Sequence, residues 1–380
     1  MGSEVIAKNL RRLREASGQT QEELARAAEL TRIGYRNLEN GQSTPRAATL
    51  QKLAAALSVG VEELVSPVRE LRCVRFRAMK RLNGREQILA EVGRRLSDYD
   101  ELEEILEERR SSSLAAAPLS KTSAIEAAQA VREMFGLRPD EPIRDICGLL
   151  ERHGIKVLSV RRASPDFFGL SVGVEDGGPA VVVNTWERIS VERWIFSAAH
   201  ELGHLVLHLD AFDVSQQQED KEEEREANQF ASHFLMPAEV FTREWRGTFG
   251  MPFADRVLKV KRIFRVSYLT VLYRLQEMDV GVNVWKLFQN SYRQRYGCGV
   301  AKIEEPAALE KSDYRASFPE SSRAKEPDVL SPTDFKEDRL WGLVRRAVEA
   351  GEISLSRGAE ILNLPLSEMR QLRQTWMERL

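Results

Sequence analysis

The sequence has few cysteines and no long apolar run. It has 380 residues and three cysteines. Because Cys73, Cys147 and Cys298 lie far apart, they fit neither a disulfide framework nor a zinc-ribbon spacing. No apolar run approaches the roughly 20 residues of a membrane-spanning helix, and the N-terminus lacks the apolar core of a signal peptide. We therefore expect a cytoplasmic protein with no membrane partner.

Composition and turn-forming residues divide the rest of the chain into segments. Together these segments predict an α+β, mainly helical protein. Short helices separated by "SGQTQ" and "NGQSTPR" come first, and the β-rich runs "FFGLSVGV" and "AVVVNTW" around "EDGGP" predict a hairpin in a later globular block. A stretch rich in Pro, Ser and charge predicts a flexible linker before a helical tail. The expected parts are a helix-rich unit at 1–67, a helical connector and linker at 68–120, the block at 121–292, the linker at 293–334 and a small helical element at 335–380.

Two basic or helical stretches keep alternative interpretations. The arginines of 69–85 fit extra phosphate contacts as well as a solvated helix face that pairs with the acidic "DELEEILEE". The tail "EISLSRGAEILNLPLSEMRQLRQTW" is compatible with a short helix-turn-helix, but a dimerisation or docking element explains it at least as well.

Histidine is scarce, and its clustering is the strongest chemical signal. Only five histidines occur, and two of them form His-Glu-Leu-Gly-His within "FSAAHELGHLVLHL" at 196–209. Ser190 as N-cap and Glu192 in the first turn predict the helix. On that helix His200 and His204 lie on one face, and Glu201 can reach a ligand-bound water. This geometry favours a metal site over a pair of satisfied core histidines.

A carboxylate from a second helix is expected to complete the metal site. The segment "EDKEEEREANQFASHFLMP" at 219–237 has an apolar face that includes Phe230. Glu226, four residues before Phe230, shares that face and is the predicted third ligand, whereas Glu222, Glu223 and Glu224 are more easily solvated. A straight helix carries His208 past the ion. His233 could line the cleft and bind an oxyanion, although a helix-surface role is more common.

The paired motifs "FSAAHELGHLVLH" and "EREANQFASHFLMP" resemble the ImmA/IrrE family of zinc metallopeptidases over about residues 120–280. The resemblance implies a zincin-like domain with a small β-sheet and one zinc ion per chain. It implies His200, His204 and Glu226 as ligands and Glu201 as general base. Members of this family typically cut a helix-turn-helix repressor, so the resemblance also implies a protein substrate.

The N-terminal stretch "TQEELARAAELTRIGYRNLENGQSTPRAATLQKLAAALSV" resembles the XRE (Cro/C1-type) helix-turn-helix domain. The resemblance implies a five-helix, lambda-repressor-like domain that binds a double-stranded DNA operator. It implies Gln21 at the start of the first motif helix, Thr31 as cap of the recognition helix and Asn40 on a phosphate. Arg32, Ile33, Arg36 and Asn37 would contact bases, and Arg14 and Glu39 would form a buried ion pair. Tyr35 takes a core position that usually holds a smaller aliphatic residue.

Charge in this domain is nearly balanced, so one copy has few phosphate contacts and a homodimer on a two-half-site operator is expected. The sequence thus predicts a nucleoid-associated DNA-binding regulator fused to a zinc endopeptidase that cleaves a repressor-type protein, a toxin-system partner or itself to relieve repression. The alternative is a non-proteolytic regulator or antitoxin-like sensor whose metal site is structural or ligand-binding. Glu201 favours the enzyme, because a pure binding site has no use for a base beside its ligand.

Overall fold

The computed structural model divides the chain into two compact units, residues 1–72 with 82–101 and residues 73–81 with 102–380. Each has its own hydrophobic core. The structure describes residues 2–67, 69–78, 85–116, 122–139, 141–208, 212, 220–278, 281–301, 304–311 and 326–377. Within these ranges no helix is long and apolar enough to cross a membrane.

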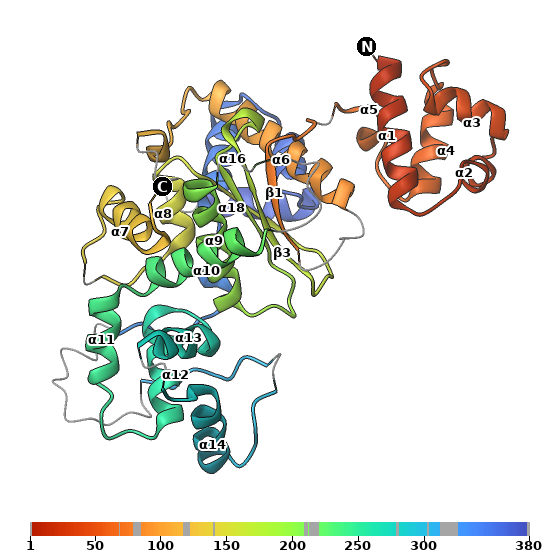
Figure 1. The fold of residues 1–380 in the computed structure, drawn as a ribbon. Coiled ribbons are helices and arrows are strands. Elements are labelled where there is room, and N and C mark those ends of the chain that lie inside the picture. Colours follow the sequence, from red (N-terminus) through yellow and green to blue (C-terminus); the bar gives the residue numbers. More distant parts are fainter. Residues whose placement is uncertain are drawn as a thin grey trace. The chain divides into compact units, whose positions relative to one another are not determined.

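The first unit begins with five short helices, as the sequence predicts (Figure 1). They are α1 (Gly2–Ala16), α2 (Gln21–Ala27), α3 (Arg32–Glu39), α4 (Ala47–Leu57) and α5 (Val61–Val65). The starts of α2 and α3 are set by threonine caps: Thr20 forms a capping box with Glu23, and Thr31 accepts a hydrogen bond of 3.0 Å from the Gly34 amide. Tyr35 is fully buried in the core between these helices. The long helix α6 (Arg85–Ile105) follows.

The second unit contains a four-stranded sheet in the order β1-β3-β4-β2. Its strands are β1 (Val74–Ala78), β2 (Lys156–Val160), β3 (Phe167–Val172) and β4 (Ala180–Asn184). The hairpin expected around "EDGGP" is present as the antiparallel pair β3–β4, and β2 pairs with β4 in parallel. Strand β1 was expected to be helical connector, and it instead covers the outer edge of β3 in antiparallel pairing. Pairing satisfies amides that an open sheet edge would leave exposed.

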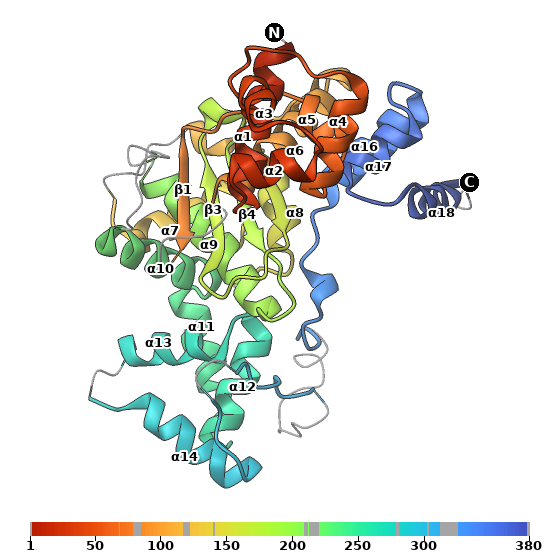
Figure 2. The same cartoon turned by 90° about the vertical axis from the view of Figure 1, so that its right-hand side faces the viewer.

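Helices cover this sheet and extend away from it (Figures 1 and 2). Helix α9 (Val191–Leu207) packs on β3 and β4, and α10 (Lys221–Leu235) packs along α9. A Cβ on Gly203 of α9 would lie 3.0 Å from the ring of Phe230 and 3.3 Å from the Cα of Ala227, so the two helices approach more closely than a side chain permits. The other helices before the tail are α7 (Ala124–Met134), α8 (Ile146–Arg152), α11 (Ala238–Arg246), α12 (Phe253–Phe264), α13 (Tyr268–Met278) and α14 (Val284–Tyr296).

The C-terminal part is more firmly attached than a flexible linker. Leu309 is buried in the main core, and Glu326 contacts the buried Arg262 of α12 at 2.7 Å. The expected linker at 293–334 is therefore anchored to the domain at Leu309 and Glu326, and residues 312–325 lie outside the described residues. The tail then forms α16 (Asp338–Ala350), α17 (Leu355–Ile361) and α18 (Leu366–Met377).

Candidate metal centre and DNA-binding surface

Two imidazoles meet on the buried face of α9. His200 and His204 are 0% and 1% exposed, and their Nε2 atoms are 3.0 Å apart. The helix places them one turn apart on the side that faces α10, because residues four apart share a helix face. The structure thus brings the two predicted ligands together, and their binding of a metal stays a prediction.

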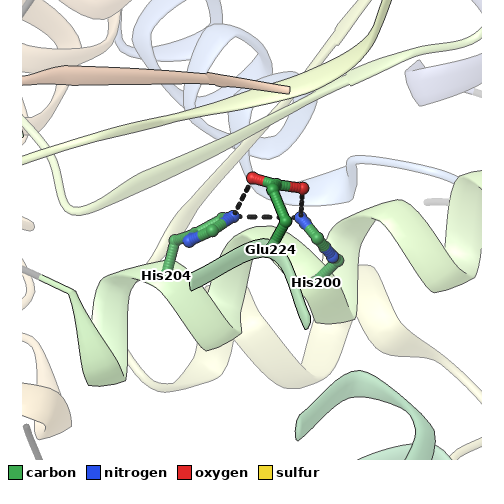
Figure 3. A group of neighbouring side chains, drawn as sticks. All are labelled: His200, His204 and Glu224. Carbon is green, nitrogen blue, oxygen red and sulfur yellow. Dashed lines mark hydrogen bonds and ion pairs between the residues drawn. The ribbon is translucent and has the colours of Figure 1, made fainter. Parts of the chain in front are cut away.

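The carboxylate that joins the histidines belongs to Glu224 (Figure 3). Its oxygens lie 3.3 Å from His200 Nε2 and 3.1 Å from His204 Nε2. The three ligand atoms of this group lie within 4.8 Å of one another. Glu224 was expected to be solvated, and its side chain is only 15% exposed.

Glu226, the predicted third ligand, is not part of this group. Its side chain is 42% exposed, and its Oε2 lies 2.9 Å from His208 Nε2. The correction follows from the phase of α10. Glu224 precedes Ala227 and Ala231 by three and seven residues, so it lies on the centre of the stripe that faces α9. Glu226 shares only the edge of that stripe.

The Nδ1 atoms of the two histidines have partners other than Glu224. His200 Nδ1 lies 3.1 Å from Asn228 Oδ1, and His204 Nδ1 lies 3.0 Å from His208 Nδ1. With protons on both Nδ1 atoms, His200 donates to Asn228, His204 donates to His208, and His208 donates to Glu226. In this arrangement two Nε2 lone pairs and a carboxylate converge on one point, which is the donor set that zinc binds.

Burial and hydrogen bonding shift the pKa values of His204 and Glu224. Burial lowers the pKa of His204 well below its usual value, although its hydrogen bond to Glu224 acts in the opposite direction. Burial alone would raise the pKa of Glu224, but the hydrogen bonds and charge of the two histidines outweigh it and hold that pKa below its usual range. A metal ion that binds here would replace the protons shared with Glu224, because the forms that bind it are a neutral imidazole and an ionised carboxylate.

Glu201 is fully buried beside the pair and faces strand β3. Its Oε2 accepts a hydrogen bond from the hydroxyl of Ser171. A Cβ on Gly169 would lie 3.1 Å from Glu201 Oε1 and 2.7 Å from the carbonyl oxygen of Val182, so only glycine fits at this point of β3. Strand β3 thus supplies a hydroxyl and the space for this carboxylate. Sequence reasoning missed both β3 residues, because their proximity to Glu201 depends on how α9 lies on the sheet.

The other two histidines of the cluster lie apart from the three ligand atoms. His208 is the C-cap of α9 and lies beyond the pair, as a straight helix predicts. His233 Nε2 is 2.5 Å from Arg274 and 3.4 Å from Glu277, both on α13. A role for His233 in an oxyanion-binding cleft stays a prediction.

The first unit presents helix α3 as an exposed surface. Arg32, Ile33 and Arg36 are exposed, Ile33 by 74%, and Asn37 is half-buried. Asn40 at the end of α3 is exposed and accepts a hydrogen bond of 3.3 Å from Arg11. These positions remain the predicted DNA contacts.

A buried ion pair braces α3 from within. Arg14 donates to both oxygens of Glu39 at 2.8 and 3.0 Å, as the family resemblance implies. Gln21, a predicted DNA contact, also donates a hydrogen bond of 3.1 Å to Glu39. Its side chain therefore has a partner within the domain. Burial alone would raise the pKa of Glu39, but hydrogen bonds from Arg14, Tyr35 and Gln21 outweigh it and lower the pKa to about 2.

Comparison with known proteins separates the same two parts. A helix-turn-helix family model matches residues 10–64. The uncharacterized HTH-type transcriptional regulator y4dJ of Sinorhizobium fredii (strain NBRC 101917 / NGR234) is 38% identical over 66 residues, which cover 17% of this chain and 86% of that protein. The chain belongs to the HTH-type transcriptional regulators. In this regulator, residues 150–276 match the IrrE N-terminal-like domain of the M78 peptidase family, and this match contains His200, His204 and Glu224.

A solved structure also aligns with the regulator. It is the apo form of ComR from S. thermophilus, 16% identical, and the alignment covers 77% of this chain and 92% of that one. Its TM-score of 0.16 is too low for any structural argument.

Proposed function

We propose that the second unit of this regulator is a zinc-dependent endopeptidase that cleaves a repressor-type protein, a toxin-system partner or its own chain and so relieves repression. The observation that carries the proposal is the convergence of His200 Nε2, His204 Nε2 and the Glu224 carboxylate in a buried site, with Glu201 beside it. One zinc ion per chain fits this donor set, which leaves a position open for water or substrate.

The residues divide the work of peptide hydrolysis. A zinc ion bound there would polarise the scissile carbonyl and lower the pKa of a bound water toward ~7. Glu201 accepts the proton of the attacking water and delivers it to the leaving amine. Ser171 orients the Glu201 carboxylate by donating its hydroxyl hydrogen bond. Asn228 and His208 hold the two imidazoles in the tautomer that presents Nε2.

The first unit connects the proposed peptidase activity to transcription, because it is the part of the chain that binds DNA. The exposure of Arg32, Ile33 and Arg36 on α3 supports a role for these side chains in reaching base edges in a major groove. Because charge in this unit is nearly balanced, we infer that two copies bind a two-half-site operator together.

Glu201→Gln tests the enzyme directly, because it keeps the volume of the side chain and removes its basic lone pair. We expect the variant to retain about one zinc ion per chain and to lose cleavage by ~10²-fold or more. Metal content is measured by elemental analysis, and cleavage by quantitative proteomics of helix-turn-helix proteins in cells. Glu222→Gln, on the exposed start of α10, is the matched control and should retain both properties.

Equal repressor levels and equal target-gene expression with wild type and Glu201→Gln would contradict the enzyme. The regulator would then be a non-proteolytic sensor whose metal site is structural or ligand-binding.

A further inference from the structure

The outer edge of strand β3 is occupied by a segment from outside the matched peptidase domain. Strand β1 pairs with β3 in antiparallel register, with Val74 opposite Val172 and Arg75 opposite Ser171. The match to the IrrE N-terminal-like domain begins only at residue 150. In the chain, β1 stands between residues 1–72 and 82–101, both of which belong to the first unit. The second unit therefore borrows its edge strand from the connection to the DNA-binding unit.

The covered edge adjoins the groups of the candidate active site. Ser171 of β3 donates its hydroxyl to Glu201, and Gly169 of β3 leaves room for the same carboxylate. Residues that face each other on antiparallel strands project to the same side of the sheet, so Arg75 shares the side of Ser171. An extended segment on this edge lies beside the catalytic groups.

Arg75 extends this contact to the metal ligand itself. Its side chain is 8% exposed and forms an ion pair with Glu223. Its Nη2 lies 3.9 Å from Glu224 Oε1, the carboxylate that faces both histidines. Glu223 and Glu224 at the start of α10 receive this buried guanidinium, and a guanidinium binds carboxylates strongly. These two carboxylates favour a basic side chain on whichever strand occupies the edge.

We propose that the edge of β3 is the peptide-binding site, that β1 is its resident occupant, and that a substrate docks there as an extended segment with Arg or Lys opposite Ser171. Peptide backbones bind exposed sheet edges through the ladder of main-chain hydrogen bonds, and side-chain pockets add specificity. While β1 is in place the edge is closed, so the chain blocks its own site until β1 leaves. This inference rests on the proposed peptidase function, because only a peptidase makes the docked peptide a substrate. Peptide docking itself is measured separately from cleavage.

Hydrogen exchange tests whether β1 is displaceable, with no need for metal or activity. Arg75→Ala in the full chain should raise exchange of the β3 amides by about tenfold, because it removes the charge-assisted contact that holds β1. Arg72→Ala is the matched control, since Arg72 is 83% exposed, and should leave β3 exchange unchanged. Equal exchange of the β3 amides in wild type, Arg75→Ala and Arg72→Ala would overturn the proposal that β1 can be displaced.

A peptide of residues 71–78 with Cys73→Ser, carrying a fluorescent label, tests docking. In a Glu201→Gln background, which prevents cleavage, Arg75→Ala in the chain should tighten peptide binding by about tenfold because the resident strand competes less well. The same peptide with Arg75→Glu should not bind. Failure of the parent peptide to bind the Arg75→Ala chain would overturn the proposal.

A disulfide between positions 74 and 172 gives a reversible lock that does not depend on Arg75. The Gly173 amide donates to the Cys73 carbonyl oxygen at 2.8 Å, so Val74 and Val172 form the neighbouring close pair that a disulfide can bridge. Val74→Cys with Val172→Cys, in a Cys73→Ser chain, should exclude the peptide when oxidised and admit it when reduced. Peptide binding to the oxidised form would place the docking site elsewhere and overturn the proposal.

The two ideas fail differently. Suppose that the peptide binds, but that the chain with wild-type Glu201 cleaves no protein. This result supports the docking site and contradicts the peptidase. Equal protein cleavage by the oxidised and reduced lock contradicts the docking site and leaves the peptidase standing.

Discussion

At the scale of single residues, three glutamates around the metal centre differ because their neighbours differ. Glu224 faces two Nε2 atoms, Glu201 faces a serine hydroxyl, and Glu226 faces the outer nitrogen of His208. The first arrangement suits a ligand, the second a proton carrier, and the third a group that orients a ligand through another residue. The same side chain therefore suits three different proposed roles because its surroundings differ.

Zinc content distinguishes the first role from the third. Glu224→Gln should empty the site, because a three-ligand site rarely survives on two. Glu226→Gln should keep the metal and lower its affinity by about tenfold, since it weakens only the chain through His208 to His204. Competition with a zinc chelator measures both affinities. The reverse order of effects would restore Glu226 as the ligand.

Glu39 predicts how the first unit responds to acid. Its pKa is about 2 in the folded chain, against 4.5 for an unperturbed glutamate. Because the folded pKa is depressed, the stabilisation is complete above pH 4.5 and is lost as the pH falls from 4.5 toward 2. Glu39→Gln should lower the free energy of unfolding by roughly 3 kcal/mol at neutral pH. Near pH 2, where the stabilisation by Glu39 is lost, the substitution should cost nothing. Hydrogen exchange of α1 and α3, corrected for intrinsic rates, measures this, and Glu15→Gln at the exposed end of α1 is the control.

At the scale of elements, α3 and α9 show opposite designs. Helix α9 is buried around its whole circumference and holds its functional groups rigidly against α10 and the sheet. Helix α3 buries Tyr35, Leu38 and Glu39 and leaves Arg32, Ile33 and Arg36 exposed. A metal centre requires fixed ligand positions, whereas a base-reading surface must be open to DNA.

The open face of α3 should determine sequence preference. Arg32→Ala and Ile33→Ala should each cost about 1–3 kcal/mol at one operator position and relax the preference there. Asn40→Ala should weaken binding evenly across sequences, because a phosphate contact carries no base information. Lys52→Ala, on α4 and paired with Glu29, is the control that should leave the preference unchanged. Binding of a randomised DNA library by the full chain measures these effects, and an unaltered preference in the α3 variants would contradict the assignment.

At the scale of the whole molecule, distant segments complete the second unit. Strand β1 comes from before the matched domain, and residues 304–311 and 326–335 return to it from beyond α14. Glu326 is the clearest tie from this side. It pairs with the buried Arg262 at 2.7 Å and with the buried Lys259 at 3.2 Å. The segment after the domain is thus needed to neutralise charges inside it.

Glu326→Ala should destabilise the second unit by about 3 kcal/mol or more, because two buried cations lose their partner. Denaturant unfolding followed by tryptophan fluorescence reports on this unit, which contains all six tryptophans. Asp328→Ala is the control two residues away: its side chain is 91% exposed, and its pair with Lys311 lies on the surface. Equal stability of the two variants would show that the tie is unimportant.

The sequence by itself determined the helix-turn-helix, the β3–β4 hairpin and the histidine pair, because caps, turn residues and a four-residue spacing act within one element. It also predicted Glu201 as the general base, because this residue adjoins His200 in the chain. Only the tertiary structure decided which carboxylate faces the histidines, since a small rotation of α10 exchanges Glu226 for Glu224. It likewise decided that Arg75 and Ser171 meet at the site, because β1 and β3 are separated by nearly a hundred residues of chain. Such contacts depend on how elements pack, and local sequence patterns do not encode that packing.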